Sequence, residues 1–181
     1  MDTNLQIAVL GGGCFWCTEA IYKQLRGVVG VTSGYAGGEM ANPKSEQVYG
    51  GSTGHAEVIK VEFDSNQVSY RDLLEVFFAV HDPTTLNKQG NDVGEQYRSI
   101  ILYADEEQKQ QAEAIIRELE EAHAYENPIV TEIKPLEKFY EAEDYHQDYL
   151  ENNPNQPYCQ LVINPKIKKF KEKFASLLKM E

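Results

Sequence analysis

The sequence predicts a two-layer fold in which a β-sheet packs under α-helices. Candidate strands alternate with candidate helices along most of the 181 residues. The chain is 41% hydrophobic and 25% charged, which is enough apolar material for a core. No repeat, low-complexity tract or linker divides it, so we expect a single domain over residues 1–181.

The first part of the chain is expected to hold a strand, a helix and a turn-rich stretch. Residues 4–10 suit a short strand that runs into three glycines. Residues 14–26 have the apolar spacing of a helix, and Gly27 is a plausible stop. Residues 28–54 are rich in glycine and are expected to form mostly turns.

The middle of the chain predicts a strand, a buried helix and a long loop. Residues 56–64 alternate as a strand, and Glu57 shares the apolar face with Ile59, Val61 and Phe63. Ser69 should cap a helix that ends near Val80 and is apolar nearly all round. The next seventeen residues, His81 to Tyr97, lack periodicity, and loops of that length are often functional.

The last part of the chain predicts two strands and two helices. Residues 98–103 and 129–133 suit strands, and Asp105 should begin a helix with its apolar stripe at Ala112, Ile115, Ile116 and Leu119. Residues 139–164 are polar and turn-rich, and residues 165–181 are expected to form a terminal helix. We interpret the lysines of that helix as its solvated face.

Charge and composition exclude several classes of protein. A net charge of −12 argues against nucleic-acid binding, which needs clustered Lys and Arg. No apolar run approaches the ~20 residues of a membrane span. Met1 to Asn4 show no basic or apolar stretch, so no signal peptide is expected. Three cysteines do not make a secreted disulfide framework, which favours a reduced, cytoplasmic protein.

The segment Gly13-Cys14-Phe15-Trp16-Cys17 is the most informative in the sequence. The glycines place Cys14 at the first turn of a helix, where the helix dipole and free N–H groups should favour its thiolate. Phe15 and Trp16 could then form the walls for a small apolar substrate group. The alternative is that both cysteines are small buried core residues.

Two further cysteines could act with Cys14. Cys17 lies three positions away, on the same side of the helix, so the two could form a redox pair. Cys159 lies in a polar, turn-rich segment that we expect to be exposed and mobile. A mobile cysteine could swing toward a partner sulfur, and the alternative is an idle surface thiol.

A possible acid lies at Glu57. A carboxyl at the edge of an apolar layer would have a raised pKa and stay protonated, although a strand-end Glu can also face solvent. His55 is expected to make a structural hydrogen bond. In the long loop, Asp92 adds a carboxyl, and Tyr97 could project into a pocket as a donor or be a core tyrosine.

With these residues in hand, the sequence resembles the peptide methionine sulfoxide reductase A family over nearly the whole chain. The resemblance rests on residues 13–16, 34–38, 53–57, 81–83, 89–99 and 145–147. It implies an α+β fold, a two-layer sandwich related to the ferredoxin-like plait with a mixed central sheet. It also implies a single catalytic domain that reduces the S epimer of free or peptide-bound methionine sulfoxide, a protein-repair reaction.

The resemblance also implies residue roles. Cys14 would be the nucleophile that becomes a sulfenic acid, Glu57 the acid, and Phe15 and Trp16 the walls for the substrate methyl. Tyr97 would hydrogen-bond the sulfoxide oxygen, with support from Asp92. Thioredoxin is the implied electron donor, and neither a cofactor nor a metal is implied.

The chain departs from the family at two positions. Ser45 stands where the family usually has a pocket tyrosine after Asn-Pro. Cys17 stands where many relatives have another residue, so the thiol that resolves the sulfenic acid could be Cys159 or Cys17. We favour Cys159, although one helical turn also permits a bond between Cys14 and Cys17.

Three other hypotheses remain open. Cys14, Cys17 and His55 could hold zinc, with Glu57 as acid and base, although the motif order is reversed relative to zinc deaminases. A general disulfide oxidoreductase would use Cys14 and Cys17 alone. A non-catalytic binding domain would show no rapid alkylation of Cys14.

Overall fold

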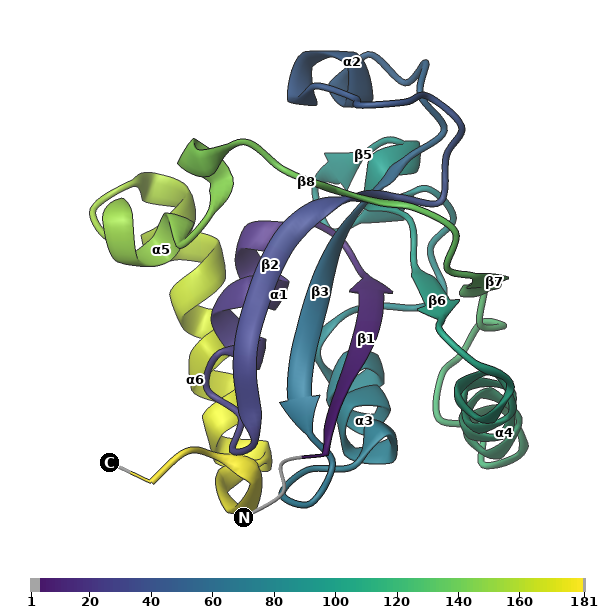
Figure 1. Ribbon diagram of the computed structural model, residues 1–181. Coiled ribbons are helices and arrows are strands. Elements are labelled where there is room, and N and C mark those ends of the chain that lie inside the picture. Colours follow the sequence, from purple (N-terminus) through teal and green to yellow (C-terminus); the bar gives the residue numbers. More distant parts are fainter. Residues whose placement is uncertain (1–3, 181) are drawn as a thin grey trace.

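A computed structural model describes residues 4–180. Residues 1–3, on which the expectation of no signal peptide partly rests, lie outside them. The fold is α+β, with a mixed, curved six-stranded sheet (Figure 1). The strand order is β7-β6-β1-β3-β2-β8. These strands are β1 Leu5–Gly11, β2 Val28–Ala36, β3 Ala56–Asp64, β6 Ile100–Tyr103, β7 Glu132–Pro135 and β8 Phe139–Glu141.

Helices cover one face of the central strands. The α-helices are α1 Phe15–Tyr22, α2 Ser45–Tyr49, α3 Tyr70–Val80, α4 Glu106–Glu121, α5 Tyr149–Asn152 and α6 Asn164–Lys173. In Figure 1, α1, α3 and α6 lie behind the sheet, whereas α4 lies beside β6 and β7 at one edge. All pairings in the main sheet are antiparallel except that of β6 with β7, so the sheet is mixed.

The core lies between the sheet and these helices. The apolar face of β3 supplies Ile59, Val61 and Phe63, all fully buried. Helix α3 packs against this face with Leu73, Leu74, Val76, Phe77 and Phe78, as its nearly continuous apolar sequence predicts. Ser69 caps α3, and Asp105 caps α4, each accepting a hydrogen bond from the backbone N–H three residues later.

Several predicted boundaries are wrong. Residues 28–54 contain the nine-residue strand β2 and helix α2, although we expected mostly turns. Strand β8 falls within the segment expected to be turn-rich. The strand predicted over residues 129–133 is β7, which begins only at Glu132. The terminal helix predicted over residues 165–181 is α6, which ends at Lys173. Among residues 4–180, no helix is both long enough and apolar enough to cross a bilayer.

Candidate active site

The chain turns sharply between β1 and α1, and this turn positions Cys14. Gly13 has a φ of +88°, which side-chain-bearing residues rarely adopt. A Cβ at Gly12 would lie 2.9 Å from the His81 ring, so the backbone there can approach α3 only because it carries glycine. Cys14 is then the N-cap residue of α1 and is partly exposed.

Cys14 and Cys17 form a pair one helical turn apart. The Cys17 N–H donates to the Cys14 carbonyl at 3.1 Å, and the two thiols are close enough to shift each other's pKa. The hydrogen bond from Cys14 lowers the pKa of Cys17 to about 7, and Lys166 and Tyr158 act in the same direction. One member of the pair can therefore carry negative charge near neutral pH.

The prediction that the helix end lowers the pKa of Cys14 is wrong. Burial raises that pKa well above its ordinary value, and the hydrogen bond with Cys17 and the charge of Glu57 add to the effect. The lost hydration of the anion outweighs the favourable helix end. The thiolate of the pair is therefore favoured at Cys17.

Glu57 is a buried carboxyl directly beside the start of α1. It is 1% exposed, and its Oε2 accepts no hydrogen bond from the described residues. Burial raises its pKa well above the ordinary value, and the charges of Asp92 and Cys17 raise it further. The Phe15 N–H, which hydrogen-bonds to the carboxyl, opposes this shift only in part. The shift favours the protonated form of the Glu57 carboxyl, which lies close to Cys14.

The long loop brings Tyr97 and Asp92 to the same place. Tyr97 closes a short 3₁₀ turn, and its pKa is raised by burial and then by the charges of Glu57, Asp92 and Cys14. The neighbouring Arg98 donates to the Gly54 carbonyl at 2.9 Å, which fixes the loop to the start of β3. The loop therefore delivers a phenol and a carboxylate to the site of Cys14 and Glu57.

The two predicted wall residues have different environments. Phe15 is fully buried, with its ring 5.7 Å from that of Tyr35 and 5.2 Å from that of His146. Trp16 stacks on Tyr149, with ring centroids 3.6 Å apart and planes inclined by 5°. The Trp16 Nε1–H also donates to His146 at 3.1 Å. Phe15 belongs to the main core, whereas Trp16 is held at its margin.

The prediction that Cys159 is exposed is wrong. Cys159 is 0% exposed and begins a π-helical turn that continues into α6. It packs in one apolar cluster with Cys17, Ala20 and Ile163, and Cys14 contacts the same cluster. The polar sequence before Cys159 is typical of an exposed segment. The burial of Cys159 depends instead on packing against α1. The fold thus gathers all three cysteines.

Two tyrosines near the site were missed by the sequence analysis. The Tyr158 hydroxyl donates to Asp92 at 3.1 Å and lies 3.7 Å from the Cys17 sulfur. Burial raises the pKa of Tyr49, and the charges of Glu57, Tyr97 and Cys14 raise it further. No local pattern marks either residue.

Ser45 begins α2 and hydrogen-bonds to the segment that follows β8. Its hydroxyl is 2.8 Å from the Tyr145 hydroxyl, which in turn donates to Glu143 at 2.8 Å. Burial alone would raise the pKa of Glu143, but the hydrogen bonds from Tyr145 and Ser45 lower it to about 2. Ser45 is therefore part of a polar network that anchors α2.

The zinc hypothesis is not favoured by the geometry. The Nδ1 of His55 accepts from the Gly38 N–H at 3.0 Å, and its Nε2 lies 2.7 Å from the Met40 carbonyl. Both ring nitrogens are therefore occupied, as expected for a structural histidine. Across the described part of the chain, no three His, Cys, Asp or Glu side chains are grouped so as to hold a metal ion.

A buried acid beside a pair of thiols, with a third thiol behind them, defines a thiol-dependent oxidoreductase. Comparison with known proteins gives the particular family. The sequence model of the peptide methionine sulfoxide reductases matches residues 6–178, and the chain belongs to this family. It is an enzyme of the MsrA type.

Individual relatives agree with this assignment. The chain is 56% identical over 176 residues to the peptide methionine sulfoxide reductase MsrA of Saccharolobus solfataricus, covering 97% of this chain and 98% of that protein. Reduced Mxr1 from Saccharomyces cerevisiae superposes with a TM-score of 0.79 at 37% identity, covering 86% and 89% of the two chains. Mxr1 in complex with Trx2 gives a TM-score of 0.57 at 28% identity, covering 82% and 89%.

Proposed function

We propose that the enzyme reduces the S epimer of methionine sulfoxide, free or in proteins, with Cys14 as nucleophile and Glu57 as acid. The observation that carries this proposal is the buried Glu57 carboxyl, which has an unpartnered oxygen beside Cys14. A carboxyl that stays protonated at neutral pH can give its proton to a sulfoxide oxygen.

The reaction starts with proton transfer. Glu57 protonates the sulfoxide oxygen, which makes the substrate sulfur electrophilic, and the Cys14 sulfur attacks it. The Cys14 proton passes to Cys17, whose lowered pKa of about 7 supports that role. The hydroxyl passes from the substrate sulfur to the Cys14 sulfur, and the bond between the two sulfurs breaks. Methionine leaves reduced by two electrons, and Cys14 is left oxidised by two electrons as a sulfenic acid.

The remaining site residues bind and orient the substrate. Tyr97 donates a hydrogen bond to the sulfoxide oxygen, and Asp92 supports the site through hydrogen bonds. Phe15 and Trp16 supply the apolar surface for the substrate methyl. The shared electrostatic environment of Tyr97, Asp92, Glu57 and Cys14 supports this arrangement.

A second thiol then condenses with the sulfenic acid, which releases water and forms a disulfide. We propose Cys159 as this resolving cysteine. The position of Cys17 one helical turn from Cys14 favours Cys17 as the second candidate. Thioredoxin would reduce the disulfide, as the complex of the yeast relative Mxr1 with Trx2 suggests.

The wider setting follows from the same proposal. The enzyme would work as a single catalytic domain over residues 1–181, in the reducing cytoplasm, and repair proteins after oxidative stress. We also propose that its sheet and helices are related to the ferredoxin-like plait. The antiparallel arrangement of β1 between β3 and β6 supports that relation.

Turnover of separated epimers tests the reaction. With dithiothreitol as reductant, we expect the S epimer of methionine sulfoxide to be reduced and the R epimer to be left. Cys14→Ser should abolish methionine release. Reduction of the R epimer alone, or of neither, would overturn the proposal. Mass mapping of the disulfide formed after one equivalent of sulfoxide identifies the resolving cysteine.

A further inference from the structure

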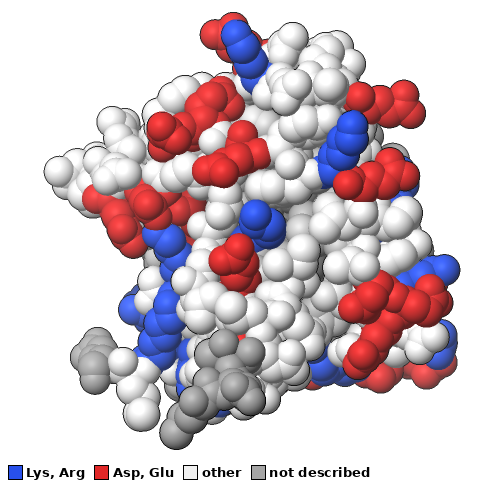
Figure 2. Space-filling view, in the orientation of Figure 1, with Lys and Arg blue, Asp and Glu red and all other residues white. Residues whose placement is uncertain are grey.

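A row of lysines lines a surface cavity that the reaction does not use. Lys166, Lys169 and Lys173 lie three and four positions apart on α6, and so share one side of the helix. All three line a cavity of about 710 Å³. Figure 2 shows basic side chains gathered along the left edge of the molecule, where α6 runs in Figure 1.

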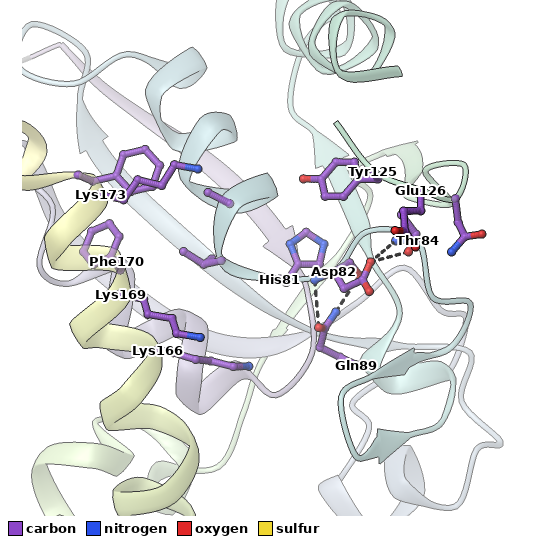
Figure 3. A pocket seen from close by; sticks show the side chains of 14 residues that line it. His81, Asp82, Thr84, Gln89, Tyr125, Glu126, Lys166, Lys169, Phe170 and Lys173 are labelled. Carbon is purple, nitrogen blue, oxygen red and sulfur yellow. Dashed lines mark hydrogen bonds between the residues drawn. The ribbon is translucent and has the colours of Figure 1, made fainter. Parts of the chain in front are cut away.

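The opposite side of this groove comes from the loop that follows α3. Figure 3 shows Lys166 and Lys169 extending from α6 toward His81, Asp82 and Gln89. A second cavity of about 540 Å³ shares Lys173 with the first and continues the groove. Together the two cavities offer a continuous surface for part of an extended peptide.

The free charge in the groove is positive on its α6 side. Within residues 4–180, none of the three lysines forms an ion pair. Asp82 and Glu126 also line the groove, but Thr84 donates to Asp82 through both its N–H and its hydroxyl. On a chain of net charge −12, this α6 side is a local site for anionic groups.

The groove ends at the loop that carries Cys14. The side chain of Gln89 packs against Gly13, since a Cβ there would lie 2.7 Å from its Cγ. His81 packs against Gly12 in the same way. Lys166 is close enough to Cys17 for its charge to favour the thiolate. The groove is thus separated from the Cys14 loop only by the side chains of His81 and Gln89, which belong to both.

We propose that this groove binds the polypeptide that flanks a methionine sulfoxide, and that Lys169 and Lys173 select substrates with acidic residues beside it. This inference rests on the proposed function. A peptide is favoured over the electron donor because the surface is concave and continuous with the Cys14 loop, so residues covalently joined to the sulfoxide must pass near it.

The test compares peptides of equal length with one central S-methionine sulfoxide, flanked by Glu or by Lys, with dithiothreitol as reductant. Two charge pairs at an exposed site should make kcat/KM roughly fivefold higher for the Glu peptide. Lys169→Glu/Lys173→Glu should abolish or reverse this ratio. Lys168→Glu/Lys171→Glu makes the same charge change on α6 but outside the groove, and should keep the ratio.

High salt should also reduce the ratio for the wild-type enzyme, because the lysines are exposed. Equal kcat/KM for the two peptides in the wild-type enzyme would overturn the proposal. It would also be overturned if the two double variants changed the ratio of kcat/KM between the peptides equally. A defect of Lys169→Glu/Lys173→Glu seen only with thioredoxin would assign the groove to the donor instead. If the proposed function itself were wrong, free methionine sulfoxide would not be reduced either. That result distinguishes failure of the proposed function from failure of the groove proposal.

Discussion

The hydroxyl of Tyr158 donates a hydrogen bond of 3.1 Å to Asp92. This contact joins the residue before Cys159 to the loop that carries Tyr97, across 66 positions of sequence. The same hydroxyl lies 3.7 Å from the Cys17 sulfur. A single phenol therefore links the substrate loop, one candidate resolving cysteine and the segment that carries the other.

Removing this hydroxyl should change how Cys17 ionises. In Tyr158→Phe we expect the pKa of Cys17 to rise above its value of about 7, since the hydrogen bond from Tyr158 helps to lower it. The fold should lose about 1 kcal/mol of stability. Alkylation of Cys17 as a function of pH, followed by peptide mass mapping, measures the shift. Tyr149→Phe removes a phenol from the same cluster and should leave the profile unchanged.

Tyr49 is expected to contribute to turnover. The family usually has its pocket tyrosine four positions earlier, where this chain has Ser45. The Tyr49 phenol is close enough to Glu57, Tyr97 and Cys14 to feel their charges. Loss of a transition-state hydrogen bond in Tyr49→Phe should lower kcat/KM about tenfold, which corresponds to about 1.4 kcal/mol. Tyr103→Phe, on β6, is the control. Equal kinetics for the two variants would show that Tyr49 takes no part.

The site was more predictable from sequence than several of the elements that surround it. Cys14 and Glu57 each sit in a dense local motif, so their convergence could be anticipated. Strand β2 was missed because its glycines suggest turns. Gly34 is required there by tertiary packing, since a Cβ would lie 2.3 Å from the Phe139 ring across the strand pair. No local pattern contains that information.

The pKa of Cys14 and the burial of Cys159 also could not be predicted from the local sequence. The position of Cys14 at a helix N-terminus suggested a lowered pKa, but burial dominates and raises it. Cys159 follows a polar segment and yet is fully buried. In both residues the property depends on how much water the assembled fold excludes, which is set by contacts between distant segments.

Glu57→Gln should remove the proton donor and so abolish activity. It should also make the protein more stable relative to wild type as pH rises. The folded-state pKa of Glu57 lies above the value of 4.5 for the unfolded chain. As pH rises between these two values, the unfolded carboxyl ionises while the folded one stays protonated, so the wild-type protein loses stability. The loss is at most about 1.4 kcal/mol per pH unit.

The glutamine variant lacks this loss, so its melting temperature relative to wild type should increase with pH while its activity is lost. Glu62→Gln, on the exposed side of β3, controls for the amide substitution. A constant difference in melting temperature across that pH range would show that Glu57 is not held protonated by the fold.

Serine variants at the two candidate resolving cysteines should behave differently. Cys159→Ser should still release one methionine per enzyme without reductant, because Cys14 is intact, but lose turnover driven by thioredoxin. Cys17→Ser should keep that turnover, at a reduced rate, since Cys17 no longer accepts the Cys14 proton. Methionine release and thioredoxin oxidation measure the two steps. The reverse pattern would assign the resolving role to Cys17.

Alanine substitutions at Gly13 and Gly51 separate backbone strain from steric clash at the turn that carries Cys14. Gly13 and Gly51 both have positive φ, +88° and +73°, so alanine at either position is strained to a similar degree. At Gly51 a Cβ would meet nothing within 4 Å, whereas at Gly13 it would lie 2.7 Å from Gln89. Gly13→Ala should therefore destabilise the fold by about 1 to 3 kcal/mol more than Gly51→Ala. Urea unfolding of both variants measures the difference, and equal losses would mean that Gln89 moves aside freely and does not hold the catalytic turn in place.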